Sequence, residues 1–468
     1  MHITARVCHN VTAPASVEDL IAAPTLQYRH RRRFASEAPD CGGACDWSAD
    51  NQRVDAKPFE RLVPLQHCPN RCSGRGLCYA DTQCRCFLTD GVVGSDAAVG
   101  NDCNASAPSK PCINGCSGVG ACENGVCLCD AQRYGVDCSL PWRHVGGSLP
   151  RRPRIYVYEL PAALNTWQEV MAVERNVGWH LWQALLKSEH RTTNGREADY
   201  FFIPVFPMGT VSLGVALAAL EEVVHRFPWW NATRGFNHLM VGAYDFGLCQ
   251  ISGLPFFERI RMISHFGHLG SGKYFCHAPI GGPSYRPGID LLVPDTMEML
   301  YKFASPYLTG NTQARPTTFF FAGNPTGIWR SKLFAMNLTQ SGYRILDHHV
   351  DLGREMASAQ FCGDFGAGGF STRFALAVVS GCIPVFLDEL RPAWSDVMPI
   401  DDFAIRLSKA DFLRGRLPSV VAAVTPERMA QLQDAGRAVW TRYVWAFMGM
   451  NVTHDAFELF ISRLALLV

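Results

Sequence analysis

The sequence predicts an α/β protein in which two small disulfide-rich modules precede two Rossmann-like halves. Fifteen of the 19 cysteines lie before residue 140, so a cysteine-dense region precedes a cysteine-poor one. Beyond residue 150, apolar strand-like runs alternate with amphipathic helix-like runs, a pattern typical of parallel sheets covered by helices. A stretch rich in Thr, Gly, Asn and Pro at 305–317 divides this region in two. We expect ligands at the carboxyl ends of its strands.

Composition narrows the classes of partner. A chain of 468 residues with 48% hydrophobic content has room for roughly two to four domains and a large core. A formal net charge of +1 gives no broad field for nucleic acid or anionic membranes, so we expect no nucleic-acid partner. Basic clusters at 29–33 and 151–154 are typical of solvated linkers, with docking of a polyanion as the alternative.

Two cysteine clusters repeat one spacing. The second follows C-x3-C-x5-C-x4-C-x-C-x8-C, and the first repeats it with a longer last loop. Spacing alone leaves fifteen connectivities for six cysteines. The clusters resemble EGF-like modules, at 63–106 and 107–143. The resemblance implies that the first cysteine pairs with the third, the second with the fourth and the fifth with the sixth: Cys68–Cys78, Cys72–Cys84, Cys86–Cys103, Cys112–Cys122, Cys116–Cys127 and Cys129–Cys138.

Such modules need their bridges because ~40 residues bury too little apolar surface to fold unaided. The alternative, a zinc site, lacks the usual C-x2-C pairs and has only His67 nearby. Disulfides require an oxidising compartment, and five glycosylation sequons agree with one: Asn10, Asn104, Asn231, Asn337 and Asn451. The first thirty residues contain no apolar segment that predicts a signal peptide or anchor. We therefore expect the sequence to lack its leader, and leave 1–62 as an unassigned stem.

After a linker at 144–153, apolar runs predict the strands of the two halves, 154–305 and 306–445. The runs are 154–158, 201–205, 239–242, 291–293, 318–322 and 383–387. The apolar stretch 201–220 is long enough to span a membrane, but Pro204 and Pro207 favour a strand followed by a helix at 211–225. Another helix is predicted to begin at Thr425-Pro426.

The segment 446–468 is predicted to be a C-terminal helix. Its apolar residues fall at helical spacing and predict a packing face that closes back on the first half: Phe457, Phe460, Ile461 and Leu464.

The stretch GAGGFSTRFALAVVSGCIPVFLDE at 366–389 predicts a loop, a helix and a strand. Glycines let the backbone approach another group closely, Ser371 or Thr372 is an N-cap candidate, and Arg373 lies in the first turn. Backbone N–H groups and a guanidinium that point one way can bind a phosphate. The alternative is a glycine turn that serves only tight helix–strand packing.

Five ordered blocks resemble the exostosin glycosyltransferase family. They are RIYVYELP at 154–161, ADYFFIPVF at 198–206, PWWNATRGFNHLMVGAYDFG at 228–247, TTFFFAGN at 317–324 and SAQFCGDFGAGGFSTRFALAVVSGCIPVF at 358–386. The resemblance implies a GT-B fold with an acceptor half and a nucleotide-sugar half. It also implies inverting transfer from a nucleotide sugar, expected to be a UDP-sugar, to a cell-wall or matrix glycan in the Golgi, without a bound metal or other cofactor. Relatives form homodimers or heterodimers with another glycosyltransferase, and EGF-like modules occur in algal and protist relatives, so we expect an algal source.

The same resemblance suggests which residues hold the donor. Residues of the glycine stretch are expected on the diphosphate: Gly366, Gly368, Gly369, Ser371, Thr372 and Arg373. Arg330 is expected to contact the diphosphate or the acceptor, or else to be a surface arginine. Leu376 stands where many relatives carry an acid that holds the donor ribose. Asp388 or Glu389 is expected to take over that role.

An inverting transfer also needs a general base. Asp245 is our first candidate and His238 our second, because both lie beside a strand that should end at the cleft. The alternative is that Asp245 caps a turn and His238 packs at a sheet edge.

Two further alternatives stay open. Cys249 with Cys276, and Cys362 with Cys382, could each form a disulfide, but a buried free thiol is the expected state of Cys382 in an apolar strand. In function, the alternative to an enzyme is an inactive transferase-like glycoprotein that acts in adhesion or glycan binding.

Overall fold

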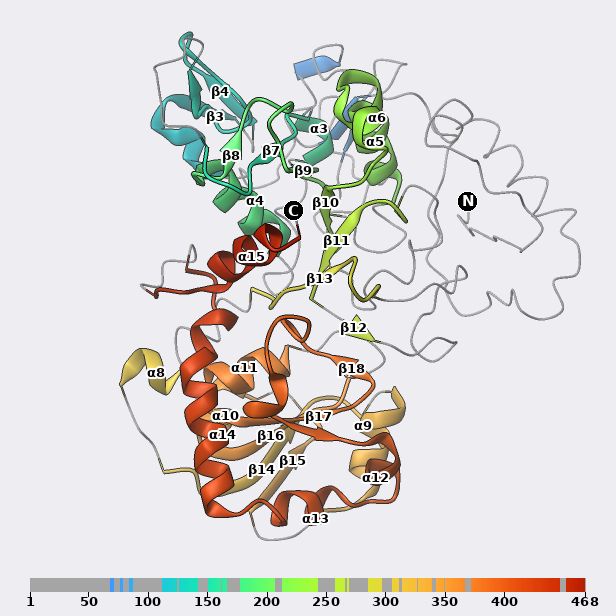
Figure 1. Ribbon diagram of the computed structural model, residues 1–468, viewed down its shortest axis with the longest axis vertical. Coiled ribbons are helices and arrows are strands. Elements are labelled where there is room, and N and C mark those ends of the chain that lie inside the picture. Colours follow the sequence, from blue (N-terminus) through green and yellow to red (C-terminus); the bar gives the residue numbers. More distant parts are fainter. Residues whose placement is uncertain are drawn as a thin grey trace, which may run out of the picture.

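The computed structural model describes residues 68–70, 76–78, 84–86, 112–123, 126–141, 150–160, 162–165, 177–206, 213–242, 257–265, 267–268, 285–296, 305–310, 314–325, 327–338, 342–348, 350–366, 372–446 and 452–467. Within them, two parallel sheets stand one above the other, with a small cysteine-rich module beside the upper one (Figure 1). The predicted α/β class with two sheet-forming halves is confirmed.

The first half is built on a six-stranded sheet. Its strands are β7 (Ile155–Val157), β8 (Arg191–Thr192), β9 (Tyr200–Phe202), β10 (His238–Val241), β11 (Arg261–Ser264) and β13 (Leu291–Leu292). They lie in the order β13-β11-β10-β9-β7-β8, and every pair is parallel. The inner strands β9 and β10 are buried at every position, as expected for a parallel sheet covered on both faces.

Alternate residues of each strand enter two different cores. Phe202 packs in one core with α4 (Val177–Lys187), whereas Phe201 packs in the other with α5 (Leu213–Arg226) and α6 (Trp229–Thr233). The helix predicted at 211–225 is therefore present within two residues, and the strand predicted at 201–205 is present but ends three residues earlier, at Phe202. No helix among the described residues is both long and apolar enough to cross a bilayer.

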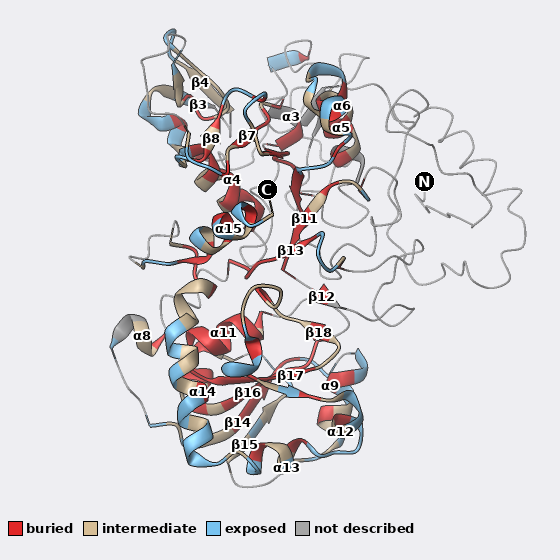
Figure 2. Ribbon diagram, viewed as in Figure 1, coloured by how far each residue is buried: buried red, intermediate tan, exposed pale blue. Residues whose placement is uncertain are grey.

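The second half is built on a five-stranded parallel sheet. Its strands are β14 (Thr317–Ala322), β15 (Tyr343–Leu346), β16 (Ala359–Asp364), β17 (Ile383–Leu387) and β19 (Ile405–Leu407), in the order β15-β14-β16-β17-β19. The helices around it are α8 (Pro306–Thr309), α9 (Gly327–Ala335), α10 (Leu352–Ala357), α11 (Arg373–Val379), α12 (Lys409–Leu413), α13 (Leu417–Ala422) and α14 (Pro426–Val439). Figure 2 shows β16, β17 and α11 as the most buried part of this half.

Both sheets place the strand that comes first in sequence between the second and the third. In the second half β14 lies between β15 and β16, and in the first half β7 lies between β8 and β9. This order reverses the direction in which the chain winds, so the connections after the first and third strands diverge and leave a crevice at their carboxyl ends. Each sheet therefore has a switch point where a ligand can bind.

Two segments join the halves. β12 (Gly267–His268) pairs antiparallel with β18 (Leu390–Arg391), which links the first half to the second. The chain then returns through the 3-10 turn Trp440–Tyr443 to α15 (Ala456–Ala465), and the hydroxyl of Tyr200 in β9 donates to the carbonyl of Leu464, 2.9 Å away. The predicted return of the C-terminal helix to the first half is thus confirmed (Figure 1).

The cysteine-rich module consists of a 3-10 segment (Ile113–Gly118) and two short hairpins, β3 (Gly120–Glu123) with β4 (Val126–Cys129) and β5 (Arg133–Tyr134) with β6 (Leu140–Pro141). Disulfides join Cys112–Cys122, Cys116–Cys127 and Cys129–Cys138, which is the pairing that the resemblance implied. The sulfurs of Cys112, Cys116 and Cys127 lie within 4.8 Å of one another, but they are in disulfides and offer no thiolate to zinc.

Less of the first cysteine cluster is described. β1 (Gly76–Cys78) pairs antiparallel with β2 (Cys84–Cys86), and Cys68 and Cys84 are both disulfide-bonded. Cys72 and Cys103 lie outside the described residues, so the three pairings for this cluster stay predictions.

The expectation of a free thiol at Cys382 is wrong. Cys362 of β16 and Cys382, which directly precedes β17, form a disulfide with their Cα atoms 5.9 Å apart. The two strands are parallel neighbours, and this pairing brings together two cysteines that are 20 residues apart in sequence. Cys249 and Cys276 lie outside the described residues.

Candidate active site between the two halves

Two arginines meet at the switch point of the second sheet, where β14 and β16 end. Arg373, in the first turn of α11, donates from Nε and Nη2 to the carbonyl of Ala322, at 2.9 and 2.7 Å. Arg330 of α9 donates from Nε to the carbonyl of Phe365, at 3.0 Å. Their guanidinium carbons lie 5.3 and 5.9 Å from the centre of the Phe321 ring. The strand-end carbonyls thus hold two cations at one place.

This arrangement concentrates positive charge in a buried site. Arg330 is only 7% exposed, so it is not a surface arginine. Burial, and secondly the charge of Arg373, lower the pKa of Arg330 to about 10, while the Asp364 carboxylate acts in the opposite direction. A bound anion would relieve the repulsion between the guanidinium groups.

Gly323 lets the backbone pass beside this pair. Its φ is +152°, and a Cβ atom at this position would lie 2.4 Å from Nη2 of Arg373. Any larger residue would displace the guanidinium from the end of β14.

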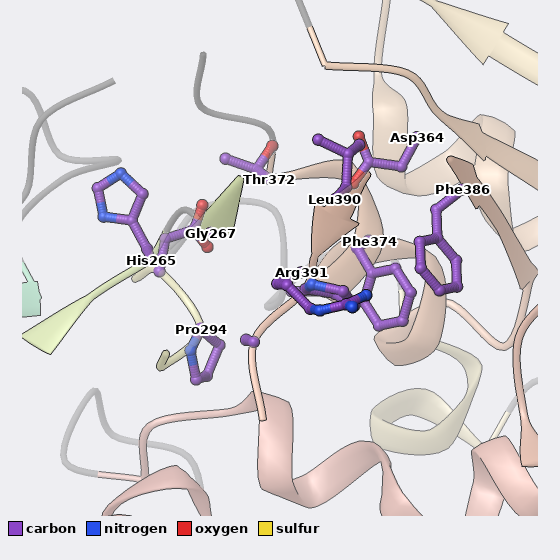
Figure 3. Close-up of a pocket in the computed structure, with 13 residues that line it drawn as sticks. His265, Gly267, Pro294, Asp364, Thr372, Phe374, Phe386, Leu390 and Arg391 are labelled. Atoms are coloured by element: carbon purple, nitrogen blue, oxygen red, sulfur yellow. The ribbon is translucent and has the colours of Figure 1, made fainter. Parts of the chain in front are cut away.

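A pocket lies between the two halves, beside the first turn of α11. Thr372 and Phe374, which flank Arg373 in sequence, line it, but neither Arg330 nor Arg373 is among its described lining residues. Figure 3 shows His265 and Pro294 on one side and Asp364, Phe374 and Phe386 on the other. The described residues that line it are His265, Gly267, Pro294 and Asp295 from the first half, and Asp364, Thr372, Phe374, Ala375, Phe386, Leu390, Arg391, Pro392 and Ala393 from the second.

Three polar residues of this pocket were not among the sequence candidates: His265, Asp295 and Asp364. All are buried, at 7%, 2% and 6% exposure. Each stands at or just beyond the carboxyl end of a strand, in RMISH, LLVPD and AQFCGD. The sequence pattern that could have identified them is a polar residue at or shortly after the end of an apolar strand.

The residues of the glycine stretch are only partly described. Gly366 is buried just beyond β16, and Thr372 is the N-cap of α11, 8% exposed and part of the pocket lining. The Thr372 side chain makes no capping hydrogen bond to the helix. Gly368, Gly369 and Ser371 lie outside the described residues.

Of the two candidate bases, His238 lies in the core of the first half and has no exposed surface. Its Nδ1 lies 3.2 Å from the carbonyl of Phe236, which can only accept, so Nδ1 carries the proton and Nε2 accepts from the Tyr158 hydroxyl at 2.8 Å. Burial lowers the pKa of His238 to about 4. This geometry favours a packing role for His238 over that of a catalytic base. Asp245 lies outside the described residues.

The ribose candidates have local roles in this structure. Leu376 is fully buried on the core face of α11. Asp388 accepts from the backbone N–H of Lys409 at 3.1 Å, and the Glu389 carboxylate pairs with the Lys409 ammonium at 2.5 Å. Neither acid is among the residues that line the pocket.

Comparisons with curated proteins find plant glycosyltransferases. The chain is 26% identical over 298 residues to "Probable glucuronosyltransferase Os04g0398600" of Oryza sativa subsp. japonica, which covers 56% of this chain and 68% of the relative. It is 25% identical over 323 residues to "Probable beta-1,4-xylosyltransferase IRX10L" of Arabidopsis thaliana, covering 60% of this chain and 74% of the relative.

Solved structures give a weaker match. "Crystal structure of GtfA/B complex" is 11% identical, with a TM-score of 0.27, and the match covers 49% of this chain and 58% of that one. The chain thus spans just over half of that structure, and at this TM-score the match does not establish a shared fold. The family model described as Exostosin GT47 domain, by contrast, matches residues 149–424, which is more than half of the chain. The chain therefore belongs to the exostosin GT47 family.

Proposed function

We propose that this protein is an inverting glycosyltransferase that moves a sugar from a UDP-sugar to a polysaccharide or glycoprotein glycan. The observation that carries the proposal is the arginine pair Arg330 and Arg373 at the switch point of the second sheet. Family membership and the names of the plant relatives support glycosyl transfer.

The pair suits a nucleoside diphosphate as leaving group. Negative charge builds on the β-phosphate as the bond to the anomeric carbon breaks, and positive groups placed there in advance stabilise that charge. Guanidinium groups bind phosphate oxygens in pairs of parallel hydrogen bonds. We propose that Arg373 and Arg330 supply this stabilisation without a catalytic metal, together with Thr372 and the glycine stretch.

The pocket suits a reaction between two substrates. Its walls come from both halves, so a donor on the second half and an acceptor on the first would meet there. The names of the plant relatives make UDP-glucuronic acid and UDP-xylose the first donors to test. Disulfides form and persist in oxidising compartments, and we propose that this compartment is the Golgi lumen.

The test is thermal stability of the full chain with UDP, uridine and GDP, in EDTA and then with Mn²⁺. A ligand at 100 times its Kd stabilises the folded state by about 2.7 kcal/mol, so we expect UDP to raise the Tm by several degrees in EDTA. Arg373→Ala should abolish the rise. Arg354→Ala, which changes an exposed arginine of α10, should keep it.

If Arg373→Ala does not fold, Arg373→Lys replaces it. Lysine keeps the charge but cannot form the double contact with Ala322, so the UDP-dependent rise should shrink. Folded wild-type protein that shows no rise at millimolar UDP would refute the proposal and favour the adhesion alternative.

A further inference from the structure

The first-half wall of the pocket offers two groups that can accept a proton. The described residues of this wall are His265, Gly267, Pro294 and Asp295, and among these only the imidazole and the carboxylate have this chemistry. In an inverting transfer, the base must stand on the side from which the acceptor attacks, opposite the leaving group. The arginine pair marks the leaving-group side, on the second half.

Strand pairing brings the two groups to the same edge of the first sheet. β11 and β13 are parallel neighbours in which Ser264 is level with Leu292, and Val293 donates its N–H to the carbonyl of Ser264 at 2.9 Å. His265 directly follows β11, and Asp295 stands three residues beyond Leu292. His265 and Asp295 therefore line the pocket from adjacent strand ends.

Two tryptophans anchor the chain beside Asp295, Trp394 from the second half and Trp445 from the segment between the 3-10 turn Trp440–Tyr443 and α15. The backbone N–H of Trp394 donates to the carbonyl of Leu292 at 3.0 Å, and the indole N–H of Trp445 donates to the carbonyl of Pro294 at 3.0 Å. Both indoles are buried. A segment held on both sides keeps Asp295 in place, which is the support that a preorganised site needs.

We propose that His265 is the general base that activates the acceptor hydroxyl. We propose further that Asp295 positions the imidazole of His265 and stabilises its protonated form. This inference rests on the proposed function. The hydroxyl proton passes to an imidazole nitrogen of His265, and the oxygen's electron pair forms the bond to the anomeric carbon. The bond from that carbon to the diphosphate oxygen breaks, and its electron pair leaves with the diphosphate beside Arg330 and Arg373.

Histidine fits the task because its ordinary pKa lies near the pH of the secretory pathway, whereas that of a carboxylate lies far below it. Among the described residues, the charged groups that line the pocket with His265 are Asp295, Asp364 and Arg391. The carboxylates favour the imidazolium that forms during the reaction, and Arg391 opposes it.

The first test compares His265→Gln, Asp295→Asn and Asp245→Asn with the control His225→Gln, which changes an exposed histidine of α5. UDP release is measured from pH 5 to 8 with UDP-xylose or UDP-glucuronic acid as donor and a β-1,4-linked xylo-oligosaccharide as acceptor. We expect His265→Gln to lower kcat about 100-fold, with the UDP-dependent rise in Tm unchanged.

The positioning role of Asp295 has its own readout. In the wild type, kcat/KM should rise with pH as His265 loses its proton. Asp295→Asn removes a carboxylate that favours the imidazolium, so the rise should move to lower pH and kcat should fall about tenfold. A merely structural carboxylate would lower stability without moving the pH profile.

A second measurement needs no turnover. In histidine-labelled protein, the NMR signal that disappears in His265→Gln should shift when UDP is added, and its pKa should fall in Asp295→Asn. The inference is overturned if the His265 signal does not shift although UDP binds and raises the Tm. It is also overturned if His265→Gln retains kcat within fivefold of the wild type, or if Asp245→Asn alone removes the pH dependence of kcat/KM. Loss of UDP stabilisation in the wild type would instead refute the proposed function.

Discussion

Arg330 and Arg373 approach the same aromatic ring from two different helices. The guanidinium carbon of Arg330 lies 5.9 Å from the centre of the Phe321 ring, and that of Arg373 lies 5.3 Å from it. Each is held by a carbonyl just beyond or at the end of a strand, from Phe365 and Ala322. Burial and, secondly, the charge of Arg373 lower the pKa of Arg330.

Arg330→Lys tests whether the pair recognises the diphosphate. Lysine keeps one positive charge but cannot reproduce the planar fork that binds phosphate oxygens in pairs. We expect the Kd for UDP to rise about tenfold while the weak affinity for uridine stays unchanged. Calorimetric titration measures both, with Arg354→Lys as the control on an exposed position. Equal losses for UDP and uridine would contradict a phosphate contact.

The buried His238 predicts acid sensitivity of the fold. Burial lowers its pKa to about 4, below the ordinary 6.5, so the folded state binds the proton less readily than the unfolded chain. The stability that this histidine contributes is present above pH 6.5 and is lost as the pH falls toward 4. By pH 5 the loss should be about 2 kcal/mol.

His238→Gln provides the check. The variant should be less stable than the wild type at pH 7.5, because the imidazole packs against Phe201 and Trp230. Since glutamine does not titrate, the gap between the two proteins should narrow by about 2 kcal/mol at pH 5. Urea unfolding at both pH values measures it, and a gap that does not change with pH would show that His238 titrates normally.

Arg191 ties the cysteine-rich module to the first half. This side chain, 8% exposed, lies 3.0 Å from the Glu159 carboxylate and 3.8 Å from that of Asp137, and it donates to the Ser139 hydroxyl at 2.7 Å. Burial raises the pKa of Glu159, an effect that Arg191 opposes. Ile113 of the module is buried in the main core of the transferase halves.

Arg191→Ala should therefore destabilise the whole chain by ~3 kcal/mol, because it leaves the buried Asp137 carboxylate and the half-buried Glu159 carboxylate without their cation. Arg151→Ala removes a pair with Glu189 in which both side chains are largely exposed, at 70% and 64%, so it should leave the stability almost unchanged. Denaturant unfolding compares the two variants. Similar losses would mean that the module is not docked through Arg191.

The disulfide Cys362–Cys382 closes the loop that carries Thr372 and Arg373. Replacing both cysteines by alanine should lower the stability by about 3 kcal/mol, as expected for a crosslink that spans 20 residues. It should also weaken UDP binding, because α11 is then held less firmly beside β14. Peptide mapping without reduction should recover the two cysteines as one crosslinked pair, and alkylation of Cys382 in unreduced, unfolded protein would contradict the structure.

Several features of the fold could be predicted from local patterns. Apolar runs indicated five of the strands within a residue or two, because a strand covered on both faces is apolar throughout. β16 was not predicted as a strand, since AQFCGD contains polar and small residues. The pairing of Cys112 through Cys138 followed from a family resemblance rather than from spacing, which does not distinguish among fifteen connectivities.

The site was predicted less completely. Arg373 and Arg330 were named separately, and nothing local indicated that their guanidinium groups meet over Phe321. His238 was expected near the cleft because it lies beside a strand that should end there, but it is the first residue of β10, whereas ligands bind at carboxyl ends. His265, Asp295 and Asp364 lie at or shortly after strand ends, and their place in the pocket depends on strand order.

The sequence by itself determined the α/β alternation, the cysteine clusters and the loop–helix–strand unit around Arg373, because each depends on residues close together in the chain. Only the tertiary structure decided that Arg330 joins Arg373, that Cys362 joins Cys382, and that strand ends of both halves share one pocket. The physical reason is strand order. Which strands become neighbours is set by the packing of the whole sheet, and local periodicity carries no information about it.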